Sequence, residues 1–182
     1  MRILFFIDSL ISGGKERRIV ELMKGLRQAP GVEFEIVLMN DQVHYQEVFA
    51  MKIPVHYLIR ETKRDISVFK KFYRICKNFR PDIVHCWDSM TAVYAVPVCK
   101  LLGIKLINGM VVDTPVTRNF SNKYWMRGKL TFPFSSLVLG NSKAGLNAYG
   151  APAGKSACVY NGMNFSRFNQ LRDPGCVRKE LL

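Results

Sequence analysis

Short apolar runs alternate along the chain with stretches in which apolar residues recur every three or four positions. The runs have the length and composition of strands buried on both faces, and they lie at residues 3–7, 32–39, 53–58, 82–86, 105–107, 137–139 and 157–160. The periodic stretches predict helices with one buried face, and they lie at residues 19–26, 65–79, 89–102 and 123–130. Because strands alternate with helices, we predict a doubly wound α/β fold with a mostly parallel sheet and helices on both faces.

Breaking and capping residues set the ends of these elements. Arg80 precedes a proline and ends its helix, because that position disfavours the α region. We expect Asp88 or Ser89 to cap the next helix, and Ser142 to cap a short helix further along. Parallel α/β sheets bind ligands at the carboxyl ends of their strands. The loops that follow the strands are therefore the candidate site, and they are 8–15, 86–89, 108–120, 140–142 and 160–165.

Two adjacent glycines follow the first strand. Gly13 and Gly14 lack Cβ atoms, so they allow a positive φ and let backbone amides come close to a ligand. The helix that follows presents free N–H groups and a partial positive charge, both of which favour phosphate. The sequence contains neither G-x-G-x-x-G nor G-x-x-x-x-G-K-[ST], which disfavours a dinucleotide site and a P-loop. A flexible turn before a solvated, charged helix is the alternative.

The positive charge of the chain is concentrated in two segments. The formal net charge is +13, and the excess comes from 60–80, with eight basic and two acidic residues, and from 121–182, with nine and two. Such zones indicate an anionic partner, either a phosphate group or a membrane surface. No recognition motif accompanies the charge, so we do not predict nucleic-acid binding. The basic helix at 65–79 either packs on the sheet with a solvated rim, which we favour, or lies on an anionic membrane.

Cysteine usage and hydropathy indicate the compartment. The five cysteines are an odd number without a C-x-x-C pair, which argues against a disulfide framework or a metal centre and favours a reducing cytoplasm. No run approaches the roughly 20 apolar residues of a membrane span, and the run 3–7 lacks the cleavage site of a signal peptide. We therefore predict a cytoplasmic protein without a metal ion, peripheral on the inner face of the membrane if the basic helix lies there.

Three stretches of the chain together carry a family resemblance. They are ILFFIDSLISGGKERRIVELMKGL, RPDIVHCWDSMTAVYAVPVCKLLGIKLI and SSLVLGNSKAGLNAYGAPAGKSACVYNGMNFSRF, and they cover nearly the whole chain. In this order they resemble the retaining glycosyltransferases of family four. The resemblance implies a GT-B enzyme that moves a sugar from a nucleotide-sugar donor to a glycan or lipid-linked acceptor, with no metal or other cofactor.

The resemblance also implies a domain organisation. Residues 1–172 would form the amino-terminal, acceptor-side Rossmann-like domain, and 173–182 would begin a carboxy-terminal, donor-binding domain that is missing from the chain. We therefore expect the chain to be inactive on its own.

Roles for individual residues follow from the resemblance as well. Gly13, Gly14 and Lys15 would approach the donor diphosphate, with the helix N-terminus offsetting the charge that develops on the leaving group. Lys15 stands where the family has a small residue, so it either assists phosphate binding or points outward. A second group would bind the acceptor, and it consists of His85, Trp87, Asp88, Thr114, Asn141, Asn161 and Gly162.

The acceptor candidates have structural alternatives. His85 binds an acceptor hydroxyl or is a hydrogen-bonded core residue, and Trp87 stacks on the acceptor or packs against the next helix. Asp88 is more readily explained as a helix cap than as a base. The loop after the fifth strand lacks the histidine of many relatives, and Asp113, beside Thr114, is our candidate catalytic residue in its place.

Two functions of other classes compete with this interpretation. One is a non-catalytic α/β module that binds a glycan or lipid, which we would favour if no second domain accompanied the chain. The other is a nicotinamide-dependent oxidoreductase, which the missing glycine fingerprint weakens.

Overall fold

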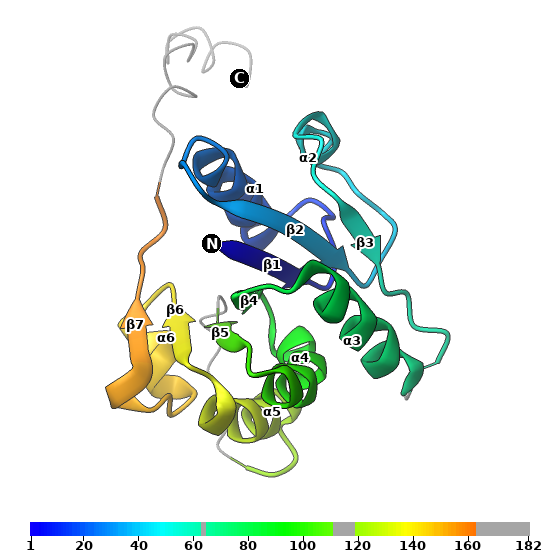
Figure 1. The fold of residues 1–182 in the computed structure, drawn as a ribbon. Coiled ribbons are helices and arrows are strands. Elements are labelled where there is room, and N and C mark those ends of the chain that lie inside the picture. The colour runs from blue at the N-terminus through cyan, green and yellow to red at the C-terminus, as the bar shows by residue number, and fades with distance from the viewer. Residues whose placement is uncertain (63–64, 111–118, 163–182) are drawn as a thin grey trace, which may run out of the picture.

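A single parallel sheet organises the chain. The structure is a computed structural model that describes residues 1–62, 65–110 and 119–162, so the predicted domain boundary at 172 lies outside the described residues. In these residues seven strands pair in the order β3-β2-β1-β4-β5-β6-β7, and all neighbours are parallel (Figure 1). The strands are β1 (Arg2–Ile7), β2 (Glu33–Leu38), β3 (Val55–Tyr57), β4 (Ile83–Cys86), β5 (Lys105–Met110), β6 (Leu137–Gly140) and β7 (Ser156–Cys158).

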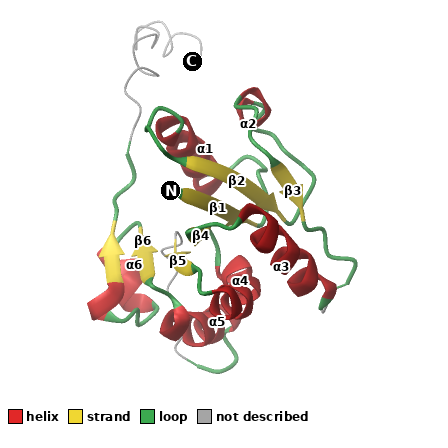
Figure 2. Cartoon of the chain, in the orientation of Figure 1, coloured by secondary structure: helices red, strands yellow, loops and turns green. Residues whose placement is uncertain are grey.

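Helices cover both faces of the sheet (Figure 2). α1 (Gly14–Leu26) packs on one face through Ile19, Val20 and Met23. α3 (Ser67–Phe79) and α4 (Ser89–Leu102) pack against each other and on the opposite face. The remaining helical elements are α5 (Lys123–Thr131), α6 (Lys143–Ala148), the short α2 (Glu47–Ala50) and the 3-10 turns Phe132–Phe134 and Ala153–Lys155. The predicted doubly wound α/β fold is confirmed.

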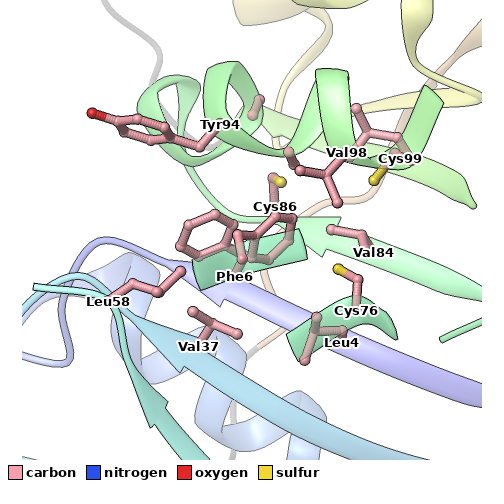
Figure 3. Close-up of a cluster of buried hydrophobic side chains, with 14 of the residues drawn as sticks. Leu4, Phe6, Val37, Leu58, Cys76, Val84, Cys86, Tyr94, Val98 and Cys99 are labelled. Atoms are coloured by element: carbon pink, nitrogen blue, oxygen red, sulfur yellow. The ribbon is translucent and has the colours of Figure 1, made fainter. Parts of the chain in front are cut away.

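β1 is buried on both sides because of its sequence. Alternate residues of a strand face opposite sides of a sheet, so Phe5 packs towards α1 while Phe6 packs towards α3 and α4. The ring of Phe6 stacks on that of Phe72 with 4.7 Å between the centroids, and neither side chain is exposed. Figure 3 shows Phe6 in this second layer, among side chains of β2, β4 and α4. The continuous apolar run at 3–7 thus serves two cores.

The strand order contains one reversal. From β1 the chain moves outward to β2 and β3, and then returns to β4 on the other side of β1. At such a reversal, ligands of parallel α/β sheets bind in the crevice between the carboxyl ends of the two strands. The residues that follow β1 and β4 lie at this reversal.

Several predicted features are confirmed. α3 ends at Phe79, and Arg80 adopts a left-handed φ of 51°. Asp88 caps α4 and Ser142 caps α6, each through its side chain. The basic helix α3 packs on the sheet, as favoured, with its apolar face in the core.

Other predicted boundaries are wrong. β5 reaches Met110, whereas the sequence predicted a loop from residue 108 onward. Asn108 lies fully buried inside this strand, where its Nδ2 donates to Oγ1 of Thr131 at 2.8 Å, so its polarity gave the false impression of a loop. The last strand is Ser156–Cys158 rather than 157–160. α2 was not predicted, because its four residues are too few to show a helical period.

Candidate functional site

Two aspartates meet where β1 and β4 end. Asp8 follows β1 and Asp88 follows β4, and the backbone N–H of Asp8 donates to Oδ2 of Asp88 at 3.0 Å. Oδ1 of Asp88 accepts from the amides of Met90 and Thr91, at 2.8 and 2.9 Å. Asp88 is therefore the predicted helix cap, and it also links the ends of two neighbouring strands.

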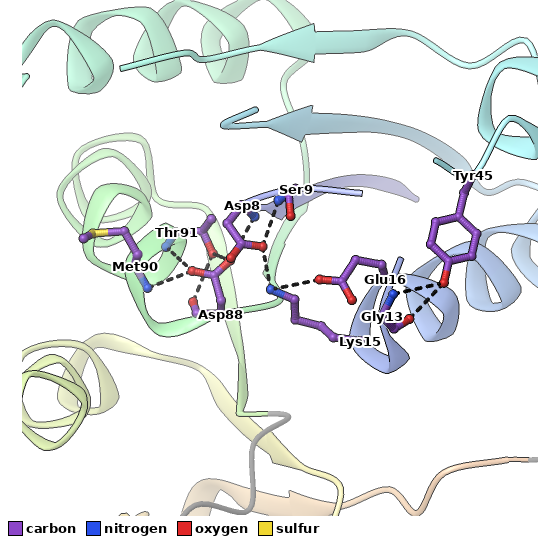
Figure 4. Close-up of polar contacts among 9 residues, drawn as sticks. All are labelled: Asp8, Ser9, Gly13, Lys15, Glu16, Tyr45, Asp88, Met90 and Thr91. Carbon is purple, nitrogen blue, oxygen red and sulfur yellow. Dashed lines mark hydrogen bonds and ion pairs between the residues drawn. The ribbon is translucent and has the colours of Figure 1, made fainter. Parts of the chain in front are cut away.

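The side chain of Lys15 lies between acidic groups (Figure 4). Its Nζ donates to Oδ1 of Asp8 at 2.5 Å and lies 3.5 Å from Oε1 of Glu16. Only 17% of the Lys15 side chain is exposed. Lys15 thus does not point outward, and its ammonium group is paired within the chain rather than free.

The surroundings shift the pKa values of Lys15 and Asp88. Burial lowers the pKa of Lys15, but the hydrogen bond and charge of Asp8, aided by Asp88 and Glu16, outweigh burial and raise it. Burial and the charge of Asp8 raise the pKa of Asp88, although Lys15 and the capping amides act in the opposite direction. We name Asp8, Lys15, Glu16 and Asp88 the charge cluster. Its one cation pairs with Asp8 and Glu16, and Asp88 is joined to Asp8 through the backbone.

Gly13, the first glycine of the turn, is held by a tyrosine. Its backbone is extended, with a φ of −173°, so the predicted use of a positive φ is wrong. The Tyr45 hydroxyl donates to the Gly13 carbonyl at 2.9 Å, and the Gly13 N–H donates to the same hydroxyl at 3.4 Å. A Cβ at Gly13 would collide with the carboxylate of Glu16. The glycine therefore makes room for Glu16, and its amide already has an acceptor.

The contact with Tyr45 belongs to a longer pairing. Residues 10–13 run along residues 43–45, beginning with a parallel bridge between Leu10 and Val43. The N–H of His44 donates to the Leu10 carbonyl at 3.0 Å, and the N–H of Ser12 donates to Nδ1 of His44 at 3.2 Å. We call this the turn pairing. It holds the glycine turn from the side opposite Asp88 (Figure 4).

The N-terminus of α1 keeps free donors beside the charge cluster. The first helical hydrogen bond runs from the N–H of Arg17 to the Gly13 carbonyl at 3.1 Å, and no side chain among the described residues caps the helix. The amides of Gly14, Lys15 and Glu16 therefore lack helical acceptors. Gly14 is exposed, and a Cβ added to it would meet nothing within 4 Å. Gly14 is thus an exposed glycine whose N–H has no helical acceptor, with open space beside its Cα.

His85 and Trp87 lie on the α1 side of the sheet. Trp87 is 5% exposed and belongs to the core beneath α1, with 5.0 Å between its ring centroid and that of His85. Arg18 of α1 places its guanidinium carbon 5.8 Å from the centre of the Trp87 ring. Burial, and then the charge of Arg18, lowers the pKa of His85 to about 4, so its imidazole is neutral at pH 7. Trp87 packs against α1 rather than the helix that follows it, and its ring offers no open face for stacking.

The other acceptor candidates lie further along the sheet. Asn141 follows β6 and is half-buried, and its side-chain oxygen has no hydrogen-bond partner in the described part of the chain. Asn161 and Gly162 are exposed beyond β7. β6 and β7 are two and three places from β4 in the sheet, so these residues are not brought together with the charge cluster. Asp113 and Thr114 lie outside the described residues.

One family model matches most of the chain. The model of Glycosyltransferase Family 4 covers residues 12–167, from the glycine turn to beyond β7. The chain belongs to glycosyltransferase family 4. This match confirms the resemblance carried by the three stretches of sequence. No curated protein matches the family 4 chain by sequence.

Solved structures show which fold the family 4 chain shares. Anabaena HepE in complex with UDP superposes with a TM-score of 0.78 at 20% identity, over 100% of this chain and 50% of that chain. The apo form of WaaB, a lipopolysaccharide outer core galactosyltransferase, gives 0.68 at 19% identity, over 91% and 47%. MurG of Acinetobacter baumannii gives 0.65 at 14% identity, over 90% and 46%. The family 4 chain spans about half the length of these proteins, and its fold is one half of a GT-B glycosyltransferase.

The site of the family 4 chain contains residues that the sequence did not single out. Asp8 and Glu16 hold Lys15, and Tyr45 holds Gly13, yet none of the three was a candidate. Asp8 had a usable signal, because it is the first polar residue after a buried strand at the reversal. Tyr45 had none, since its contact with Gly13 joins positions 32 residues apart.

A double-mutant cycle tests the pairing of Lys15 with Asp8. We expect Lys15→Met and Asp8→Asn to show a coupling of about 1–2 kcal/mol in urea unfolding, because Lys15 is mostly buried while Asp8 is half exposed. The more exposed pair Lys24 and Glu21, also in α1, is the control. Lys24→Met and Glu21→Gln should couple by only about 0.3 kcal/mol. Equal couplings for the two pairs would contradict a special role for Lys15.

The neutral state of His85 predicts a pH dependence of stability. Its pKa in the folded protein, about 4, lies below the ordinary value of 6.5, so the unfolded chain binds more protons between these values and stability falls as the pH falls. We expect this residue to lower the free energy of unfolding by about 2 kcal/mol from pH 7 to pH 5. Urea unfolding of His85→Gln should lack this loss, and His44→Gln should retain it. An unchanged pH dependence in His85→Gln would refute the assignment.

Proposed function

We propose that this chain is the amino-terminal, acceptor-side half of a retaining glycosyltransferase, which moves a sugar from a nucleotide-sugar donor to a glycan or lipid-linked acceptor. Membership of family 4 supports the reaction class. The likeness to HepE, whose structures hold UDP or UDP-glucose, supports a nucleotide-sugar donor. In this proposal the chain works with a donor-binding half, because it spans about half of each matched structure, and it does not catalyse transfer alone.

The open amide of Gly14 is the observation that carries the donor role. A helix N-terminus binds phosphate oxygens through free N–H groups and a partial positive charge. This end of α1 lies beside the ends of β1 and β4, with open space beside the Cα of Gly14. The donor diphosphate would approach the amides of Gly14 and Lys15, which offset the negative charge that develops on the leaving group. The Gly13 amide and the Lys15 ammonium take no direct part, since Tyr45 and Asp8 hold them.

The acceptor is proposed to lie against the charge cluster. The side chain of Asp8 is 48% exposed, so its carboxylate can accept a hydrogen bond from an acceptor hydroxyl. Asp88 positions Asp8 through the bond between them, and neutral His85 lies on the α1 side of the same strand ends. The roles of the remaining candidates stay predictions, and these are Asp113 in catalysis and Thr114, Asn141, Asn161 and Gly162 in acceptor binding.

The proposal includes no metal ion or other cofactor. Among the described residues, no group of three or more His, Cys, Asp or Glu side chains is placed to hold a metal ion. That transfer proceeds without one stays a prediction.

Alanine substitutions at two glycines of α1 distinguish a direct contact with the donor from a general effect on the helix. In a protein that carries both halves of the fold, Gly14→Ala should raise the KM for a UDP-sugar at least tenfold, because a methyl group would enter the open space that the diphosphate is proposed to fill. Gly25→Ala is the matched control, since Gly25 lies in the same helix and its Cβ would also meet nothing within 4 Å. Its KM should stay within twofold of the wild-type value.

The measurement is transfer of a radiolabelled sugar from a panel of UDP-sugars. Equal KM values for the two variants would contradict the role of Gly14. No transfer by the wild-type two-half protein to any glycan or lipid acceptor would contradict the proposed function and favour a non-catalytic module.

We further propose that the protein acts in the cytoplasm and that α3, although its main apolar face packs on the sheet, contacts an anionic membrane together with α4 through their outer side. No helix in the described part of the chain is both long and apolar enough to cross a bilayer. Between α3 and α4 lies an apolar groove of about 400 Å³, lined in part by Phe69, Tyr73 and the 74%-exposed Leu101. Nζ of Lys77 lies 5.9 Å from the centre of the Tyr73 ring, which brings positive charge to the edge of the groove. Apolar surface beside exposed cations is typical of contact with anionic lipid.

Vesicle co-sedimentation tests this contact. The chain should bind vesicles that contain phosphatidylglycerol and not those of phosphatidylcholine alone. Because each cation near such a surface contributes about 1 kcal/mol, Lys77→Glu should weaken binding at least fivefold. Lys143→Glu, which reverses an exposed charge on α6, is the control and should change it less than twofold. The same loss in both variants would indicate a general charge effect and overturn the proposed surface.

A further inference from the structure

Two hydrogen-bond donors beside the charge cluster lack acceptors. Nε1 of Trp87 and Nη1 of Arg18 are buried atoms without a hydrogen-bond partner in the described residues. The Arg18 guanidinium carbon lies 5.8 Å from the centre of the Trp87 ring, so both donors border the same small region. A buried donor left unpaired costs about 1–3 kcal/mol. Two such donors side by side indicate a place where an acceptor belongs.

The charge of Arg18 is also uncompensated. None of the salt bridges in the described residues includes Arg18, and burial lowers its pKa. The neighbouring carboxylates of Asp8 and Glu16 are paired with Lys15 instead. The adjacent imidazole of His85 is neutral at pH 7, in part because of Arg18 itself. The region between α1 and the end of β4 therefore carries one unmatched positive charge.

We propose that Arg18 and Trp87 bind an oxyanion of the acceptor, which is a carboxylate or a phosphate group. A guanidinium presents its N–H groups as a planar fork that matches the two oxygens of such a group. Arg18 is partly exposed on α1, so an oxyanion can approach its guanidinium from solvent. Because the guanidinium carbon lies 5.8 Å from the centre of the Trp87 ring, in this proposal a change of the Arg18 rotamer admits the oxyanion to Nε1 of Trp87 as well.

This inference rests on the proposed function and narrows its substrate class. An acceptor with an oxyanion is an acidic glycan or a sugar joined through phosphate, and a neutral glycan would leave Arg18 unmatched. Lys15 does not supply this site, since it is bound within the charge cluster.

Indole N–H signals in two-dimensional NMR of the 182-residue chain test the site directly. The chain has two tryptophans, so two indole cross-peaks are expected, and Trp125→Phe identifies that of Trp87. Methyl phosphate, methyl glucuronide and, as the neutral probe, methyl glucoside are added in turn. We expect the Trp87 indole proton to move downfield and saturate with at least one anionic probe, and not to move with methyl glucoside.

Variants of the two neighbouring arginines provide the control. Arg18→Gln should weaken binding of the anionic probe at least tenfold, while Arg17→Gln, at the preceding exposed position of α1, should change it less than twofold. If Arg18→Gln does not fold, Arg18→Lys replaces it and should still weaken binding, because an ammonium lacks the planar fork. Response to methyl phosphate alone assigns a phosphate-bearing acceptor, and response to the glucuronide alone assigns an acidic sugar.

Three results would overturn the inference. They are an equal response to the neutral sugar, no movement of the Trp87 signal with any probe, and anion binding that survives in the Arg18 variant. The experiment needs no donor and no catalysis. Failure of sugar transfer in the protein with both halves would therefore not affect the NMR result, and failure of the proposed function can be distinguished from failure of this inference.

Discussion

Burial of β1 on both faces is the constraint on which the rest of the molecule depends. Its five consecutive apolar residues at 3–7 pack into two separate cores, so no polar side chain has a place within this buried part of the strand. The first one, Asp8, appears where the strand leaves the sheet, and the chain returns beside it as β4. Asp88 follows β4 at the same level, and the two ends become joined by a hydrogen bond. The polar site is thus a direct outcome of an apolar strand with a reversal next to it.

Pairing within the charge cluster decides which groups of the turn remain available. Lys15 is paired with Asp8 and Glu16, and the Gly13 amide donates to the hydroxyl of Tyr45. What remains exposed is backbone, namely the first amides of α1, whose positive character does not titrate and does not depend on a side-chain rotamer. Arg18, one helical turn further along α1, has no ion-pair partner in the described residues. This region therefore has two separate sources of positive charge, the N-terminus of α1 and the Arg18 guanidinium.

The fold was largely predictable from the sequence, whereas the site was predictable only in outline. The main strands and helices each show their period in the sequence. A strand buried on both faces leaves a continuous apolar run and a helix buried on one face leaves an apolar stripe, and neither pattern depends on distant residues. The loop sequence also pointed to the ends of β1 and β4, where the charge cluster lies. The sequence did not reveal that Asn108 lies inside the sheet, where its Nδ2 donates to Thr131, or that the charge of Lys15 is matched by a residue before the turn. In both cases the partner comes from another element, and a single sequence does not reveal such partners.

The turn pairing gives residues 43–45 an influence on the proposed donor site that needs no contact with the donor. The phenol of Tyr45 takes the place on the Gly13 amide that an incoming oxygen would otherwise occupy. The segment between β2 and α2 therefore determines how many backbone N–H groups of the glycine turn remain free. Loss of the Tyr45 hydroxyl would free the Gly13 amide and so add a donor to this end of α1 without any change in the helix itself.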